Sequence, residues 1–159
     1  MMPKLSKDMV EEFKLFIPYV EGLRSLKEDN WNKPISDGKW TLKDIISHIM
    51  LWDKYFYEEA IHKVKLEESV TARHLDFNEF NAKAIEYAKT KSVDDIIQTC
   101  IEYRSKIIED ISGLPEEEYL REYKDGDKKK FSIRGYLRAF ISHDKHHKKQ
   151  IVKFIKGVS

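Results

Sequence analysis

Residues 132–155 read SIRGYLRAFISHDKHHKKQIVKFI, a stretch that joins a long amphipathic pattern to three closely spaced histidines. Its apolar residues recur at steps of three and four, which is the spacing of one buried helix face. Ser132 precedes the pattern and is a suitable N-cap. The stretch therefore predicts a long final helix that packs against other helices through Ile133, Tyr136, Leu137, Phe140, Ile151, Phe154 and Ile155.

Two of the histidines in this stretch are placed to act together. His143 and His147 are four residues apart, so a helix sets them about 40° apart on one face. Phe140 and Gln150 lie on the same side of the helix, whereas His146 lies at the edge of this otherwise apolar face and its role stays open. Two imidazoles with this spacing can bind one metal ion, and we predict His143 and His147 as ligands.

A third histidine lies on an apolar face of an earlier helix. The sequence TLKD at residues 41–44 is typical of a helix N-terminus, and apolar spacing then predicts a helix over 42–62. His48 shares a face of this helix with Trp52 and Tyr55. An unpaired buried imidazole is costly, and either a hydrogen bond or a metal ion would compensate it. A metal ion would satisfy all three histidines at once, so His48 is the third predicted ligand.

The remaining apolar patterns complete the predicted architecture. Residues 28–38 and 124–130 are rich in turn formers and predict loops. We find no convincing strand, repeat or linker, so residues 1–159 are interpreted as a single domain. The prediction is an all-α four-helix bundle with a short extra helix between helices two and three; its long helices are residues 7–27, 42–62, 93–113 and the final helix, and the extra helix is residues 76–89.

Composition excludes several classes of function. The chain has 29 Lys and Arg against 28 Asp and Glu, a balance that argues against a nucleic-acid partner. No run of about 18 apolar residues is present, so no membrane span is expected. The single cysteine, Cys100, excludes an internal disulfide and is interpreted as a small core residue in a cytoplasmic protein.

The sequence also contains one alternative metal motif. His143-Asp144-x-x-His147 is similar to the H-E-x-x-H signature of zinc proteases, with Asp in place of the glutamate base. Asp144 is one methylene shorter than glutamate, and no His, Asp or Glu follows His147 to supply a downstream ligand. We therefore favour a third ligand from upstream, as His48 would be.

These motifs together resemble the DinB/YfiT-like family. The sequence KWTLKD at residues 39–44 leads to His48 and Trp52, and HDKHHKKQI occupies residues 143–151. Residues 78–84 and 114–120 also resemble the family's middle segments, so the likeness spans most of the chain. Lys149 stands where many members carry glycine, which affects how closely another element can pack there.

The resemblance implies a fold and a site more clearly than a reaction. It implies an up-down-down-up four-helix bundle, frequent homodimers, and a divalent ion, commonly nickel or zinc, held by His48, His143 and His147. Members of the family include S-transferases that use low-molecular-weight thiols, a maleylpyruvate isomerase and hydrolases. The residues alone suit zinc, nickel, cobalt and iron equally.

Two functional hypotheses follow. The first is a metal-dependent enzyme that transfers a thiol to a small electrophile or hydrolyses it; the lack of an unambiguous acidic base favours thiol transfer. The second is a protein that binds or sequesters a small molecule, with a structural metal or none. His62 and His74 are expected at the surface. The residues expected around the site, either as partners of the free imidazole nitrogens or as pocket wall, are Asp44, Asp53, Trp52, Tyr55, Phe140, His146 and Gln150.

Overall fold

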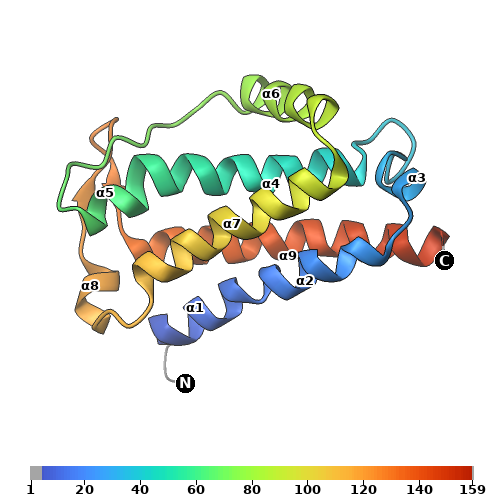
Figure 1. The fold of residues 1–159 in the computed structure, drawn as a ribbon. Helices are drawn as coiled ribbons and strands as arrows, with labels where there is room; N and C mark the ends of the chain where they lie inside the picture. The colour runs from blue at the N-terminus through green and yellow to red at the C-terminus, as the bar shows by residue number, and fades with distance from the viewer. Residues whose placement is uncertain (1–4, 159) are drawn as a thin grey trace.

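The computed structural model describes residues 5–158 and is a helical bundle, as predicted (Figure 1). The first helical segment and α9 run in one direction along the bundle, and α4 and α7 run in the other, which is an up-down-down-up order. The principal helices are α1 (Ser6–Lys14), α2 (Phe16–Gly22), α4 (Leu42–Phe56), α6 (Phe77–Thr90), α7 (Val93–Ile111) and α9 (Ile133–Val158). The extra helix α6 lies outside the four-helix arrangement, beside α4.

The first predicted helix is interrupted in the structure. It divides into α1, α2 and a 3₁₀ turn over Leu23–Ser25, with the break at Leu15. Pro18 explains the break, because proline has no N–H to donate to the Lys14 carbonyl one turn earlier. The prediction of one continuous helix over 7–27 is therefore wrong at this point, although both halves keep their apolar faces in the core.

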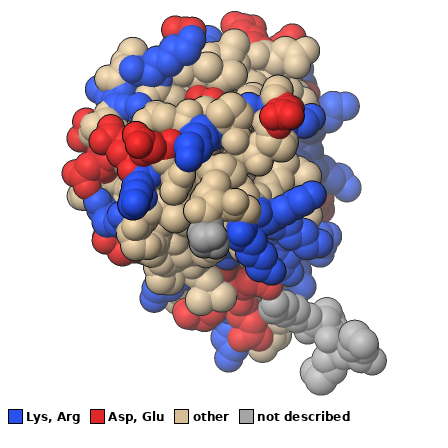
Figure 2. Space-filling model, turned by 90° about the vertical axis from the view of Figure 1, so that its right-hand side faces the viewer, with Lys and Arg blue, Asp and Glu red and all other residues tan. Residues whose placement is uncertain are grey.

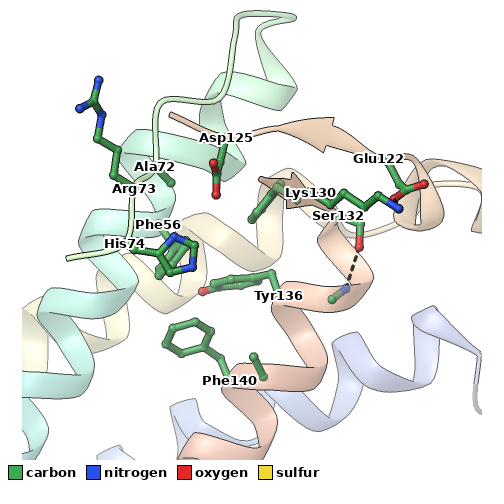
Figure 3. A pocket seen from close by; sticks show the side chains of 13 residues that line it. Phe56, Ala72, Arg73, His74, Glu122, Asp125, Lys130, Ser132, Tyr136 and Phe140 are labelled. Atoms are coloured by element: carbon green, nitrogen blue, oxygen red, sulfur yellow. Dashed lines mark hydrogen bonds and ion pairs between the residues drawn. The ribbon is translucent and has the colours of Figure 1, made fainter. Parts of the chain in front are cut away.

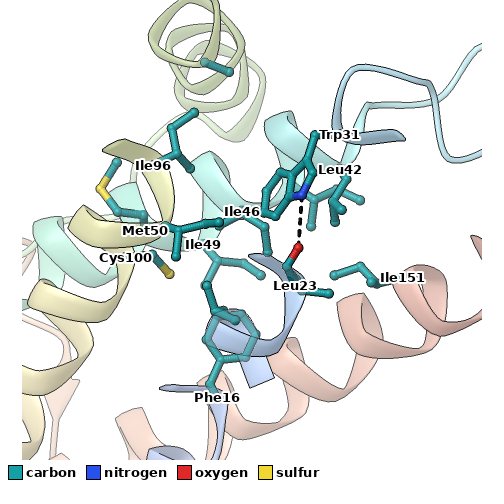
Figure 4. Packing of buried hydrophobic residues seen from close by; sticks show 14 residues of the cluster. Phe16, Leu23, Trp31, Leu42, Ile46, Ile49, Met50, Ile96, Cys100 and Ile151 are labelled. Atoms are coloured by element: carbon teal, nitrogen blue, oxygen red, sulfur yellow. Dashed lines mark hydrogen bonds between the residues drawn. The ribbon is translucent and has the colours of Figure 1, made fainter. Parts of the chain in front are cut away.

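The segment predicted as a loop over 28–38 contains a short helix, α3 (Glu28–Trp31). Trp31 is completely buried, and its indole Nε1–H donates a hydrogen bond of 3.2 Å to the Leu23 carbonyl (Figure 4). The same cluster holds Cys100, which is buried as expected, and burial raises the pKa of its thiol. The turn formers in this segment favoured a loop prediction, although burial of Trp31 stabilises the helical turn α3.

Helix α4 begins at a capping box and ends in an irregular turn. The Thr41 hydroxyl accepts a hydrogen bond from the Asp44 N–H, and the Asp44 carboxylate accepts one from the Thr41 N–H. After Phe56 the helix continues through a π-helical turn over Tyr57–Ile61 into α5 (His62–Lys65). The helix therefore extends three residues beyond the predicted end at residue 62.

The long segment that crosses from α5 to α6 is fastened along its length. The Glu59 carbonyl, in the π-helical turn, accepts hydrogen bonds from the backbone N–H groups of Thr71 and Ala72 at 2.9 and 3.1 Å. Tyr55 holds the next residue, because its hydroxyl accepts a 2.7 Å hydrogen bond from the Arg73 N–H. We call residues 66–76 the crossover segment. These bonds hold it against α4 next to the histidines.

A small hairpin lies against the crossover segment. Its strands β1 (Tyr123–Lys124) and β2 (Lys130–Phe131) pair antiparallel, where the sequence predicted only a loop over 124–130. The Gly126 N–H donates a 2.7 Å hydrogen bond to the Ala72 carbonyl. A Cβ at position 126 would lie 2.7 Å from the Thr71 carbonyl oxygen, so this approach requires glycine. The hairpin was not predicted because the crossover segment, against which it packs, is distant in the sequence.

A buried ionic network joins four helices. Arg104 of α7 is fully buried, and its guanidinium donates to Asp53 of α4 at 2.8 Å and to Asp144 of α9 at 2.8 Å. It also donates to the Phe13 carbonyl of α1 at 3.0 Å, and its central carbon Cζ lies 3.8 Å from the centre of the Phe13 ring. One side chain of α7 thus contacts the other three long segments of the bundle.

The end of the bundle that includes the last turn of α9 carries charges of both signs, separated by uncharged surface (Figure 2). This pattern agrees with the net charge of +1. Within residues 5–158, none of the helices has both the length and the apolar character needed to cross a membrane.

Replacing Arg104 with Leu is expected to destabilise the protein by about 3–5 kcal/mol, because Asp53 and Asp144 would remain buried without their counter-charge. Urea unfolding followed by circular dichroism measures the change. The control is Arg24→Leu, which removes exposed ion pairs to Asp94 and Glu21 and should alter the free energy of unfolding little. Equal effects of the two substitutions would contradict the assigned importance of the network.

Gly126→Ala is expected to lower the free energy of unfolding by about 1–3 kcal/mol, since the added methyl group overlaps the Thr71 carbonyl and the Arg73 side chain. The matched control is Gly157→Ala in α9, where the added Cβ meets nothing within 4 Å. Thermal unfolding of both variants tests this. If Gly126→Ala has the same melting temperature as the wild type, the close approach of the hairpin to Thr71 does not require glycine.

Candidate metal centre

The three histidines predicted from the sequence meet at one point. His48 extends from α4, and His143 and His147 extend from successive turns of α9. The His143 Nε2 atom lies 3.1 Å from His48 Nε2 and 3.2 Å from His147 Nε2. One ligand atom from each histidine lies within 4.8 Å of the others, so one ion can be shared among them.

Burial keeps these imidazoles neutral. Burial, followed by the neighbouring His147 ring, lowers the pKa of His48 to about 4. The same two causes in the same order, with smaller effects of other neighbours, lower the pKa of His143 to about 3, and burial lowers the pKa of His147. At neutral pH the site therefore holds three uncharged rings, the form in which histidine binds a metal ion.

Gln150 determines which nitrogen of His147 carries the proton. The His147 Nδ1 atom lies 2.9 Å from the Gln150 Oε1 atom, one turn further along α9. Because a carbonyl oxygen only accepts, Nδ1 must carry the hydrogen and Nε2 presents its lone pair to the other two histidines. This is the arrangement in which an outer hydrogen bond orients a metal-ligating histidine, and Gln150 was among the residues expected around the site.

The arrangement fits a metal ion by its donor set. If Nδ1 carries the proton in all three rings, three lone pairs converge with no donor between them. The Nδ1 atoms of His48 and His143 are buried and have no hydrogen-bond partner within residues 5–158. Three imidazoles suit zinc, nickel, cobalt or iron, and three protein ligands leave a further coordination position for another molecule.

Asp44 and Asp53 were expected to hydrogen-bond to the free imidazole nitrogens, but both bind other groups, so that prediction is wrong. Asp44 closes the capping box of α4 with Thr41, and Asp53 binds Arg104. Asp144 also binds Arg104, through both of its oxygens at 2.8 and 3.2 Å. It therefore points away from the histidine cluster, and it does not occupy the position of the base in the H-E-x-x-H signature.

The other three histidines lie outside the cluster. The exposed His146 ring packs edge-on against His147, with ring centres 5.1 Å apart. His62 lies at a half-exposed position, and its Nδ1 is 2.8 Å from the Asp110 carboxylate. His74 is exposed on the crossover segment beside Asp127. The surface positions expected for His62 and His74 agree with these contacts.

A cavity of about 580 Å³ opens beside the cluster. His48 and His143 form part of its wall, and its apolar wall is built by Trp52, Phe56, Leu75, Phe77 and Phe140. Trp52 stacks on Phe80 of α6 with ring centres 3.9 Å apart, so the extra helix holds the aromatic wall in place. Tyr55 was also expected here, but its hydroxyl is bonded to the Arg73 backbone and it does not line the cavity.

A second cavity of about 400 Å³ lies between the crossover segment, the hairpin and α9 (Figure 3). The rings of Tyr136 and Phe140 face it from α9, and His74 and Phe56 lie across from them, whereas the Arg73 guanidinium points away. Phe56, His74 and Phe140 line both cavities. The two hollows are therefore adjacent along one face of the bundle.

Comparison with known proteins agrees with this fold. The family model of the DinB superfamily matches residues 18–151, and the chain belongs to this family. No curated protein matches the sequence. The structure is similar to YfiT from Bacillus subtilis, described as a probable metal-dependent hydrolase with an unusual four-helix bundle topology. The TM-score is 0.78 at 17% identity, and the match covers 99% of this chain and 90% of YfiT.

A second similar structure is the mycothiol-dependent maleylpyruvate isomerase. Its TM-score is 0.61 at 13% identity, and the match covers 82% of this chain but 53% of that protein. This chain therefore matches about half of the isomerase. At these identities both likenesses establish a shared fold.

The contribution of α6 to the site was not predicted from the sequence. The helix was expected, but no role was expected for Phe77, Phe80 or Asn81, all of which lie beside the histidines or Trp52. The available signal was an aromatic residue, Phe77, at the start of a short amphipathic pattern, and the structure shows that it is exposed. Which helix face would cover His48 depended on the path of the crossover segment.

The metal-free protein is expected to lose stability as pH falls from about 6.5 toward 4. The folded pKa values of His48 and His143 lie below that of a free imidazole, so the unfolded chain binds more protons in this window. Each such group contributes about 1.4 kcal/mol per pH unit. Urea unfolding in the presence of a chelator, at several pH values, measures the slope. His143→Leu should flatten it and His146→Leu should not; equal slopes in all three proteins would contradict this account.

Proposed function

We propose that this protein is a divalent-metal-dependent enzyme that transfers a low-molecular-weight thiol to a small electrophilic molecule. The observation that carries the proposal is the convergence of three neutral imidazoles, two buried and one partly buried, at the edge of an apolar cavity. His48, His143 and His147 would hold the ion, with nickel or zinc as the first candidates. A bound divalent ion would lower the pKa of a thiol or of water and so supply a nucleophile at neutral pH.

The protein's own residues would bind and orient the reactants. Gln150 holds the His147 ring, so that one ligand is already oriented before any ion arrives. The faces of Trp52, Phe77 and Phe140 would bind the apolar body of the electrophile and exclude water from it. The substrate would therefore be a small, largely apolar molecule that places its reactive carbon next to the histidines.

The engagement of the nearby acids favours thiol transfer over hydrolysis. Asp44, Asp53 and Asp144 are all bonded elsewhere, and no carboxylate within residues 5–158 hydrogen-bonds to the three histidines. Hydrolysis requires a group that accepts a proton from water, whereas a thiol that is already ionised needs none. Hydrolysis is the alternative reaction for the same site, as the description of YfiT suggests for that protein.

A non-catalytic binding protein is the second candidate. The aromatic cavity favours it, because such a surface can retain an apolar ligand without any turnover. In this case the ion would be structural or absent. We also propose a homodimer, as the family resemblance implies, and light scattering of the purified protein would test this.

The metal assignment is tested by elemental analysis of the purified protein. Wild type is expected to contain one divalent ion per chain, and His48→Ala, His143→Ala and His147→Ala should each lose most of it, because two imidazoles bind weakly. The matched control is His146→Ala, which removes the exposed neighbour on the same helix. Equal metal content in wild type and His48→Ala would overturn the ligand assignment.

The reaction is tested with a panel of small electrophiles, with and without low-molecular-weight thiols. Thiol transfer predicts conjugates that require both the thiol and the metal-loaded wild type and that are absent with His48→Ala. Hydrolysis predicts product without thiol. The binding alternative predicts tight retention of an apolar ligand without product, and a large fall in melting temperature on chelation if its metal is structural.

A further inference from the structure

Two buried polar atoms beside the histidine cluster have no hydrogen-bond partner within residues 5–158. They are the His48 Nδ1 atom on α4 and the Asn81 Oδ1 atom on α6. Both residues line the 580 Å³ cavity, and the Phe80 ring beside Asn81 lies edge-on to His48 with ring centres 6.4 Å apart. A buried donor or acceptor without a partner costs about 1–3 kcal/mol, so two adjacent ones call for an explanation.

We propose that Asn81 is a positioning residue that accepts a hydrogen bond from His48 Nδ1–H and thereby holds the His48 Nε2 lone pair toward His143 and His147. This inference rests on the proposed metal site, and it adds a residue from outside the four-helix arrangement. One hydrogen bond between them would pair both buried atoms at once. The bond would fix one tautomer of the ring and its orientation.

The partners of the nearby acids are consistent with this pairing. Neither Asp44 nor Asp53 competes for this nitrogen, since both are bonded elsewhere. Asn81 is therefore the side chain available to receive it.

The same chemistry already operates at a second ligand. The His147 Nδ1 atom is bonded to the Gln150 amide oxygen at 2.9 Å. With Asn81, two of the three histidines would have an amide acceptor, one from α9 and one from α6. An amide orients the ring without adding charge, so the site keeps the neutral donor set that burial requires.

The experiment compares three variants of the full chain. Asn81→Leu keeps the size of the side chain but removes the acceptor, and Asn81→Asp keeps an acceptor oxygen. Asn78→Leu is the control on an exposed position of the same helix. Zinc affinity is measured by competition with a chromophoric chelator, and the His48 tautomer is measured in metal-free protein from the ¹⁵N chemical shifts of its ring. Circular dichroism checks that each variant is folded.

Asn81→Leu is expected to weaken zinc binding about 10- to 100-fold and to reduce the fraction of His48 that carries its proton on Nδ1. Asn81→Asp should bind zinc at least as tightly as wild type, and Asn78→Leu should match wild type in both measurements. Wild-type affinity and an unchanged tautomer in Asn81→Leu would overturn the inference. So would an Asn81→Asp protein as weak as Asn81→Leu, because space-filling alone would then explain the residue.

The two proposals fail in different ways. If wild type binds no zinc, the proposed metal site fails, and the tautomer of His48 in metal-free protein still decides whether Asn81 accepts its proton. If wild type binds zinc through the three histidines but Asn81→Leu equals it in both measurements, only the role of Asn81 fails.

Discussion

The guanidinium of Arg104 sets the rotation of the helices that carry the site. It binds Asp53 on α4 and Asp144 on α9, and it reaches the Phe13 carbonyl on α1. Asp144 is adjacent to His143, and Asp53 lies five residues after His48. Because an unpaired charge in the core is very costly, α4 and α9 cannot turn about their axes without losing these bonds. The rotation that pairs the charges is the one that brings the histidines together.

The site combines two kinds of surface. Three neutral imidazoles form one side, and aromatic rings form the other, so polar chemistry would take place against a wall that excludes water. The wall depends on parts outside the main bundle: α6 supports Trp52 through Phe80, and the crossover segment is tied to α4 by Tyr55 and the Glu59 carbonyl. The bundle holds the ligands, and these additions shape the space beside them.

Features that depend on residues close together in the sequence could be predicted, and features that depend on contacts between distant residues could not. The long helices and the His143–His147 spacing were predictable because helical periodicity is local, and Pro18 alone explains the break within the first helix. The role of the acids was not predictable. Asp44 caps the N-terminus of its own helix, and Asp53 forms an ion pair with Arg104, which lies 51 residues away in the sequence. One signal was available: Arg104 occupies an apolar position between Cys100 and Ile107, where a charge must find a buried partner.

The sequence by itself determined the helical segments, the apolar faces on which the three histidines lie, and the pair of histidines on one face of α9, because these depend on neighbours within a few turns. The tertiary structure decided that His48 meets that pair, that the nearby acids serve Arg104 or a helix cap instead of the imidazoles, and that α6 places Asn81 beside His48. Those outcomes depend on how separate helices rotate and pack against one another, which is set by burial of charge and aromatic surface across the whole core.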